Sequence, residues 1–187
     1  PDSPGLQDAP APRRLRWYLW LLLLSVDMIG PFSTDAYLPN IPKMRDDLGC
    51  SLALATLTLQ ANWVVNALAS SAVGALSDRL GRRPVLLGAM LCYVAGSVLC
   101  ALAPSIWVLV GGRVLQGVGQ GSCVLPSAIA RDLFDDVGER LRVMAFLGSL
   151  RPIVIIAAPS VGGVLGAAAG WRAIFRVLSA WGLLTGL

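Results

Sequence analysis

The chain has 187 residues, of which 56% are hydrophobic and only 14% are charged, and its mean hydropathy is +0.69. Soluble domains carry roughly 25% charged residues, so this composition excludes an ordinary soluble domain and predicts a membrane protein. The net charge of +4 is modest, and the arginines are scattered through apolar sequence, which argues against nucleic-acid binding.

The chain contains no histidine, and its four cysteines form no CxxC pair. The commonest general base and the usual zinc ligand are therefore missing. We expect no metal and no cofactor, and an enzyme is the least favoured class. The cysteines are interpreted as small apolar residues.

Residues 1–16 begin with a proline-rich stretch and end in arginines, and we predict a disordered cytoplasmic tail there. Six apolar segments follow, which predict helices at about 17–37, 52–76, 84–103, 106–129, 141–166 and 171–187. A bilayer core needs about 20 helical residues, so we expect the last helix to be truncated. The fold class is predicted as all-α transmembrane, a six-helix bundle.

Lys and Arg residues set the orientation of such a bundle, because they are enriched on the cytoplasmic side. With the N-terminus inside, nine of them fall in cytoplasmic segments, namely Arg13, Arg14, Arg16, Arg79, Arg82, Arg83, Arg131, Arg140 and Arg142. Four fall outside, namely Lys43, Arg45, Arg172 and Arg176. We therefore predict a multi-pass protein with a cytoplasmic N-terminus, and the plasma membrane is favoured over an organelle.

Two carboxylates interrupt the first apolar segment, at Asp27 and Asp35. An ionisable group at mid-membrane costs about 2.5–3.5 kcal/mol, so it indicates a function by default. Eight helical residues place the two carboxylates on roughly one side, about 12 Å apart. Two interpretations of Asp27 stay open: proton or cation binding, and a structural ion pair with Arg113 or Arg151. Asp35 either shares the functional role or lies at the membrane interface.

Other polar side chains mark the middle of the predicted helices. These candidates for substrate or proton contact are Gln60, Asn62, Trp63 and Asn66 in the second segment, Arg113, Gln116 and Gln120 in the fourth, and Arg151 in the fifth. For the amides, interhelical hydrogen bonds worth about 0.6 kcal/mol each are an equally good interpretation.

A polar stretch from 74 to 87 separates the second and third apolar segments. It carries Gly74, Asp78, Arg79, Gly81, Arg82 and Arg83. Gly81 permits a tight turn, and Pro84 suits the first turn of a helix. Either Arg82 or Arg83 can pair with Asp78 or reach Asp132. Such a surface pair is worth about 0–1 kcal/mol, which suits a latch that opens repeatedly.

The fifth segment contains Pro152 and Pro159, followed by Gly162 and Gly163. Proline removes a backbone donor and bends a helix, whereas glycine lets a neighbouring helix approach closely. A bend that rocks against a partner and simple tight packing both remain open.

Three of these stretches together resemble the N-terminal half of the major facilitator superfamily. They read GALSDRLGRR at 74–83, RVLQGVG at 113–119 and APSVGG at 158–163. Ala158 and Val154 depart from the glycines that the family often has in the third motif. Further stretches, STDAYLP at 33–39, ARDLF at 130–134 and GWRAIF at 170–175, resemble the drug:proton antiporter group near the bicyclomycin and chloramphenicol exporters.

The resemblance implies proton-driven export of small, often hydrophobic or cationic molecules by alternating access, with the proton gradient as energy source. It implies proton coupling and cation recognition at Asp27 and Asp35, and proton handling at Arg113. It also implies a cytoplasmic gate at 78–83 and a bend at Pro159, Gly162 and Gly163.

The family's twelve helices form two halves with the substrate site between them, so the resemblance implies a missing C-terminal six-helix partner half. Two alternatives remain: a metabolite importer of the same superfamily, and a non-transporting truncated remnant or regulatory half.

Overall fold

The computed structural model describes residues 13–134 and 136–186, with side chains from Tyr18 onward. Within that part the chain is entirely helical. The elements are α1 (Arg13–Asp35), η1 (Leu38–Asn40), α2 (Ile41–Leu48), α3 (Leu52–Leu80), α4 (Arg82–Leu102), α5 (Ile106–Gln120), η2 (Gly121–Val124), α6 (Leu125–Leu133), α7 (Val137–Ala169) and α8 (Trp171–Gly186), where η marks a 3-10 turn. Residues 1–12 of the predicted tail, Asp135 and Leu187 lie outside the described residues.

Local chemistry explains where the helices begin and end. The hydroxyl of Ser51 accepts a hydrogen bond from the Leu54 amide, and the Asp136 carboxylate accepts one from the Glu139 amide at 2.9 Å. Such side-chain caps satisfy amides that have no partner inside the helix. Gly81 (φ +92°) and Gly170 (φ +79°) end α3 and α7 in backbone conformations that side-chain-bearing residues rarely adopt.

The observed bounds correct the predicted ones at several places. α1 begins at Arg13, inside the predicted tail, and ends at Asp35; η1 and α2 then follow, each with a proline in its first turn. α7 runs from 137 to 169 rather than from 141 to 166.

The segment predicted as one helix at 106–129 is divided into α5, η2 and α6, and it ends at Leu133. Pro126, in the first turn of α6, has no amide to bond the carbonyl four residues earlier, so the helix changes type there.

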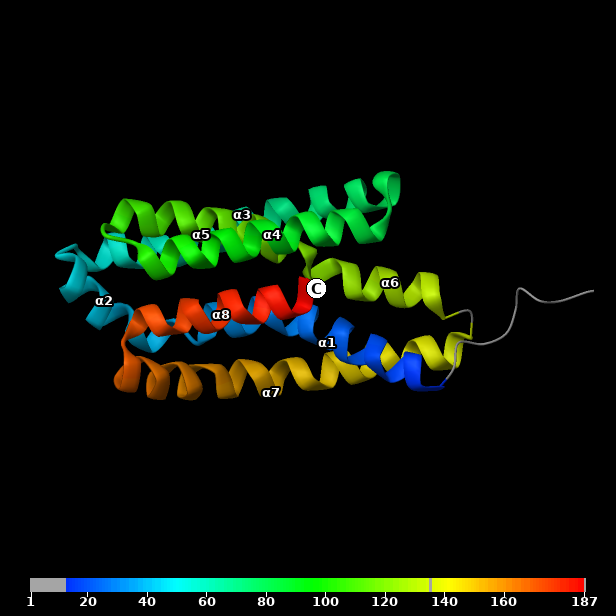
Figure 1. The fold of residues 1–187 in the computed structure, drawn as a ribbon. Coiled ribbons are helices and arrows are strands. Elements are labelled where there is room, and N and C mark those ends of the chain that lie inside the picture. Colours follow the sequence, from blue (N-terminus) through cyan, green and yellow to red (C-terminus); the bar gives the residue numbers. More distant parts are fainter. Residues whose placement is uncertain (1–12, 135, 187) are drawn as a thin grey trace, which may run out of the picture.

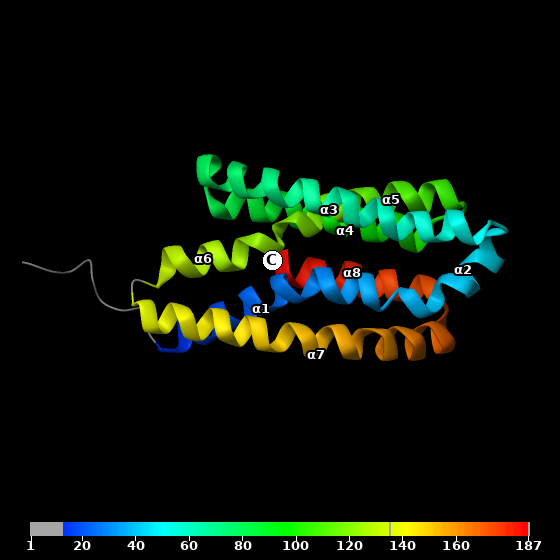
Figure 2. The same cartoon turned by 180° about the vertical axis from the view of Figure 1, so that it is seen from behind.

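The helices form an elongated bundle in which α3, α4 and α5 lie on one side and α1 and α7 on the other (Figures 1 and 2). α8 lies between the two groups and contacts α4, α7 and α1. The core contains Tyr93, Leu109 and Phe175, all with no exposed surface. The α3–α4 turn and the starts of α1 and α7 lie at one end, and α2 and the α7–α8 turn lie at the other (Figure 1).

In the described part of the chain, four helical segments are long and apolar enough to cross a membrane by length and composition: Tyr18–Leu48, Leu52–Leu80, Arg82–Leu102 and Val137–Ala169. Their burial differs. In Tyr18–Leu48, half of the residues in the apolar stretch are buried inside the bundle. The corresponding share is only 28% in Leu52–Leu80 and 17% in Val137–Ala169. α3 and α7 therefore present most of their apolar surface outward.

Candidate functional site

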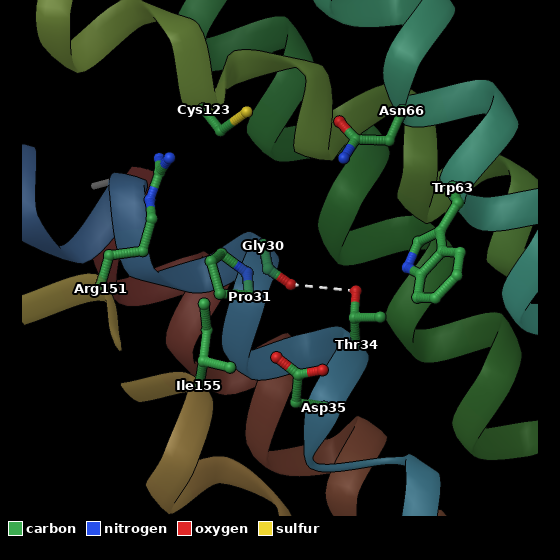
Figure 3. A pocket seen from close by; sticks show the side chains of 9 residues that line it. All are labelled: Gly30, Pro31, Thr34, Asp35, Trp63, Asn66, Cys123, Arg151 and Ile155. Carbon is green, nitrogen blue, oxygen red and sulfur yellow. Dashed lines mark hydrogen bonds between the residues drawn. The ribbon is translucent and has the colours of Figure 1, made fainter. Parts of the chain in front are cut away.

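An open pocket of about 410 Å³ lies between α1, α3, η2 and α7. Figure 3 shows the nine residues that line it: Gly30, Pro31, Thr34, Asp35, Trp63, Asn66, Cys123, Arg151 and Ile155. The pocket thus combines a carboxylate, a guanidinium, an amide and a half-exposed indole with apolar walls. Pockets that bind small molecules have this mixture of apolar lining and few polar groups.

Asp27 pairs with Arg151 beside this pocket. The Arg151 Nη2 donates to Asp27 Oδ1 at 2.5 Å. The Asp27 side chain is 8% exposed, whereas that of Arg151 is 45% exposed. The carboxylate is therefore enclosed, while the guanidinium stands at the edge of the open space. Of the two arginines considered as partners of Asp27, Arg151 forms the ion pair.

Asp35, the last residue of α1, lines the same pocket and is half-buried. Among the described residues it takes part in no ion pair. The neighbouring Thr34 hydroxyl donates to the Gly30 carbonyl at 3.2 Å, so it is already engaged with its own helix. With Asp27 and Arg151 paired, the uncompensated charge of the pocket is the Asp35 carboxylate.

Arg113 does not line the pocket but is sealed inside the bundle with no exposed surface. Its Nη1 donates to Gln116 Oε1 at 2.6 Å. Its guanidinium carbon lies 4.9 Å from the centre of the Tyr37 ring and 5.8 Å from that of Phe175. Aromatic faces stabilise a cation at these distances. Nε and Nη2 have no hydrogen-bond partner among the described residues.

The buried amides join helices to one another. Asn62 on α3 donates to the Arg113 carbonyl on α5 at 2.9 Å, Gln116 donates to the Ser97 hydroxyl on α4 at 2.8 Å, and Gln120 donates to the Ser33 hydroxyl on α1 at 3.1 Å. These contacts are interhelical hydrogen bonds, which is one of the two roles that the sequence predicted for the amides. Gln60 is exposed on α3 and does not line the pocket, whereas Trp63 does and is 54% exposed.

In the polar stretch, Arg82 joins three helices. Its Nη1 lies 2.6 Å from Asp78 Oδ1 on α3, and its Nε donates to Asp132 Oδ2 on α6 at 2.9 Å. Arg79 and Arg83 are exposed, and neither forms an ion pair with a described residue. Gly74 is half-buried in α3, and Gly81 makes the turn into α4. Of the pairings considered, Arg82 makes both and Arg83 makes neither.

Gly162 and Gly163 have different surroundings on α7. A Cβ atom at Gly162 would overlap the Ala36 carbonyl, and the Asn40 amide donates to the Gly162 carbonyl at 2.9 Å. A Cβ at Gly163 would lie 3.9 Å from Pro39, an ordinary contact. α7 continues as one helix through Pro152 and Pro159. The tight-packing interpretation therefore describes Gly162, and a functional bend at Pro159 stays a prediction.

Thr34, Cys123 and Ile155 were not predicted as site residues, although they line the pocket. Asn66, one of the amide candidates, also lines it and follows Trp63 by one turn of α3, so the two side chains lie on the same face. Cys123 was interpreted as a core residue, and no sequence signal distinguishes it from one. Within the described residues, no group of three or more Cys, Asp or Glu side chains is placed to hold a metal ion.

The curated relatives of this chain include two drug-resistance proteins and an uncharacterised transporter. Residues of this chain are 38% identical over 159 positions to a chloramphenicol resistance protein of Pseudomonas aeruginosa, covering 84% of this chain and 38% of that protein. They are 32% identical over 161 positions to the multidrug resistance protein MdtL of Klebsiella pneumoniae, covering 86% and 41%. They are 36% identical over 176 positions to the uncharacterised transporter YdgK of Bacillus subtilis, covering 90% and 42%.

The chain thus spans about two fifths of the length of these relatives. Its fold matches that of the human organic anion transporter MFSD10 with a TM-score of 0.67 at 20% identity, over 94% of this chain and 47% of that one. The match confirms the predicted all-helical bundle as half of such a transporter fold. The family model described as Major Facilitator Superfamily matches residues 23–187. This chain therefore belongs to the Major Facilitator Superfamily, a family of membrane transporters and not of enzymes.

Proposed function

We propose that this chain is the N-terminal half of a proton-coupled exporter, which moves small hydrophobic or cationic molecules across a membrane by alternating access. The observation that carries the proposal is the pocket on the α1–α7 side, where the unpaired Asp35 carboxylate faces open space beside the Asp27–Arg151 pair.

Asp35 and Trp63 favour a ligand with a positive charge and an apolar body. A carboxylate attracts a cation strongly in surroundings of low dielectric. An exposed indole adds a face that attracts the same charge. Ile155 and Pro31 offer apolar contact for the rest of the molecule. The names of the two drug-resistance relatives, which refer to chloramphenicol and to multiple drugs, agree with small-molecule ligands of this kind.

Asp27 is the proposed proton carrier. It is enclosed, so its charged form depends on the single ion pair with Arg151. A carboxylate in this position can take up a proton when the pair opens, and it is held charged when the pair closes. Arg113, sealed among Tyr37, Phe175 and Gln116, contributes a fixed positive charge rather than a binding contact.

The Arg82 cluster with Asp78 and Asp132 is the proposed cytoplasmic gate, with Arg79 and Arg83 exposed beside it. Its two ion pairs involve half-exposed side chains, so each contributes about 0–1 kcal/mol and can break during a cycle. The proposed partner is a C-terminal six-helix half that covers the exposed faces of α3 and α7. We place the N-terminus in the cytoplasm and the protein in the plasma membrane.

The test is transport by the full-length protein in proteoliposomes with an imposed pH gradient. We expect Asp27→Asn to abolish gradient-driven transport because the asparagine cannot exchange a proton, while the protein still folds. Asp46→Asn, which changes an exposed carboxylate paired with its neighbour Arg45, is the matched control and retains transport. Undiminished gradient-driven transport by Asp27→Asn would contradict the proton role. Uptake with the gradient, in place of export, would favour an importer.

A further inference from the structure

Arg151 has two carboxylates within one neighbourhood. It is paired with Asp27, and it lines the same pocket as Asp35. The two carboxylates lie eight residues apart on α1. In Figure 3 the Arg151 side chain points away from Asp35.

The Arg151 side chain is free to change direction. It is 45% exposed, and its one ion pair among the described residues is the one to Asp27. The space beside it is the pocket itself, about 410 Å³. A long side chain that borders open space can adopt other staggered rotamers without displacing packed groups. Ile155, one turn further along α7, also lines this pocket, so α7 runs past Asp35 on the side of Arg151.

We propose that Arg151 is an internal competitor for the cation site: it binds Asp27 while that carboxylate is charged, and it turns to Asp35 once Asp27 has taken up a proton. The inference rests on the proposed function and assigns to Arg151 the exclusion of cationic ligand from the protonated pocket.

The charges of the two states explain the exclusion. With Asp27 charged, its pair with Arg151 is neutral overall, and Asp35 remains free to bind a cation. With Asp27 protonated, Arg151 has lost its partner, and Asp35 is the nearest carboxylate lining its pocket. The Arg151–Asp35 pair then cancels the charge that attracted the ligand. A proton and a cationic ligand therefore exclude each other although they bind at different carboxylates.

Few other charged groups act on Asp27. Arg151 faces it from α7, and the uncharged Cys123 of η2 lines the same pocket as Arg151. α6 and α8 also pack on α1, but no described residue of theirs forms an ion pair with Asp27. At Asp35 the groups offered by α3 are Trp63 and Asn66, which are uncharged. Arg151 is thus the cation that can respond to the protonation of Asp27.

The experiment measures equilibrium binding of tetraphenylphosphonium, a lipophilic cation, to the purified full-length protein at about pH 6 and about pH 8. We expect the wild type to bind more tightly at the higher pH. In Asp27→Asn the neutral asparagine cannot form an ion pair with Arg151. We therefore expect this variant to bind tetraphenylphosphonium about tenfold more weakly than the wild type at the higher pH. Its affinity should also lose the pH dependence that comes from protonation of Asp27.

The decisive variant is the double substitution Asp27→Asn with Arg151→Gln. Removal of the competing cation frees Asp35, so we expect this variant to recover the affinity that Asp27→Asn lost. Arg142→Gln, in an exposed part of α7, is the matched control in the Asp27→Asn background and restores nothing. Each variant is first checked for a monodisperse elution profile. If one aggregates, it is remade with Asp27→Ser in place of Asp27→Asn.

The outcomes separate this inference from the proposed function. A wild type that binds tetraphenylphosphonium but is not weakened by Asp27→Asn overturns the role of Arg151 alone. The same holds for a double variant that stays as weak as Asp27→Asn. A wild type that does not bind the cation at either pH overturns the proposed cation site itself, and the inference with it.

Discussion

The α4–α5 side and the α1–α7 side of this bundle differ in how closely their helices pack. Between α4 and α5, glycines bring the two backbones into contact: a Cβ at Gly96 would lie 2.5 Å from the Gln116 nitrogen. Between α1 and α7, contacts at Trp20–Phe146 and at Gly162–Ala36 lie on either side of the Asp27–Arg151 pair, and that pair lies beside an open pocket. The first side is closed at Gly96, Gly112 and Gly119, where an added Cβ would overlap the neighbouring helix, whereas the second has room for a ligand.

The two mid-helix arginines show what this difference does. Arg113 has no exposed surface and stacks over Tyr37 in the closed side. Arg151 is 45% exposed and is held by one carboxylate at the edge of the pocket. The same residue type is thus enclosed by packed side chains in one place and bordered by open space in the other. The surroundings, and not the residue, decide which arginine can take part in a switch.

The largest effect is expected where α1 touches α7. In Gly162→Ala the new methyl group overlaps the Ala36 carbonyl, so we expect a loss of about 3 kcal/mol in the free energy of unfolding. Gly163→Ala, one residue further on, meets only an ordinary contact and should be nearly neutral. The midpoint of thermal unfolding in detergent, followed by tryptophan fluorescence, compares the two. Equal midpoints would contradict the close approach of α1 and α7.

A smaller loss is expected on the closed side. Gly96→Ala places a methyl group against the α5 backbone, and we expect it to cost about 2 kcal/mol. A Cβ added at Gly88, on the same helix, would meet no neighbouring atom within 4 Å. Gly88→Ala should therefore be neutral or slightly stabilising, since alanine is the better helix former. The same fluorescence assay tests this pair. A stable Gly96→Ala protein would mean that α4 and α5 can separate, and the contrast between the two sides would fail.

The smallest effect distinguishes the two arginines directly. Arg113→Lys replaces a stacked planar group by a more strongly hydrated ammonium, so we expect a cost of about 1–2 kcal/mol. Arg151→Lys keeps an ion pair at a half-exposed position and should change stability by less than about 0.5 kcal/mol. Urea-dependent unfolding of both variants in mild detergent measures the difference. If both substitutions cost the same, Arg113 is not sealed.

Much of the architecture could be predicted because long apolar runs have few other structures available in a bilayer. Helix ends were less predictable. The Asp136 cap starts α7 at Val137, ahead of the predicted segment, α3 continues to Leu80 until Gly81 ends it, and the division of the fourth segment depends on a single missing amide at Pro126.

The site could be predicted in part. The four mid-membrane charges were identified from sequence, but the partner of Asp27 was not, because it depends on how α7 is rotated against α1. That rotation is fixed by Gly162 packing on Ala36 and by Asn40 bonding the Gly162 carbonyl. The aromatic partners of Arg113, Tyr37 and Phe175, come from opposite ends of the chain, so no local pattern connects them to it.

In the proposed cycle, Asp27, Arg151 and Asp35 together determine how a membrane voltage acts on this pocket. With Asp27 charged and no ligand bound, the three side chains carry one negative charge, on which the field acts with about 2.3 kcal/mol per 100 mV. Once Asp27 carries a proton and Arg151 turns to Asp35, the same three side chains have no net charge, so moving them through the field requires no electrical work. Voltage would therefore act on the unprotonated, ligand-free form and leave the protonated form unaffected.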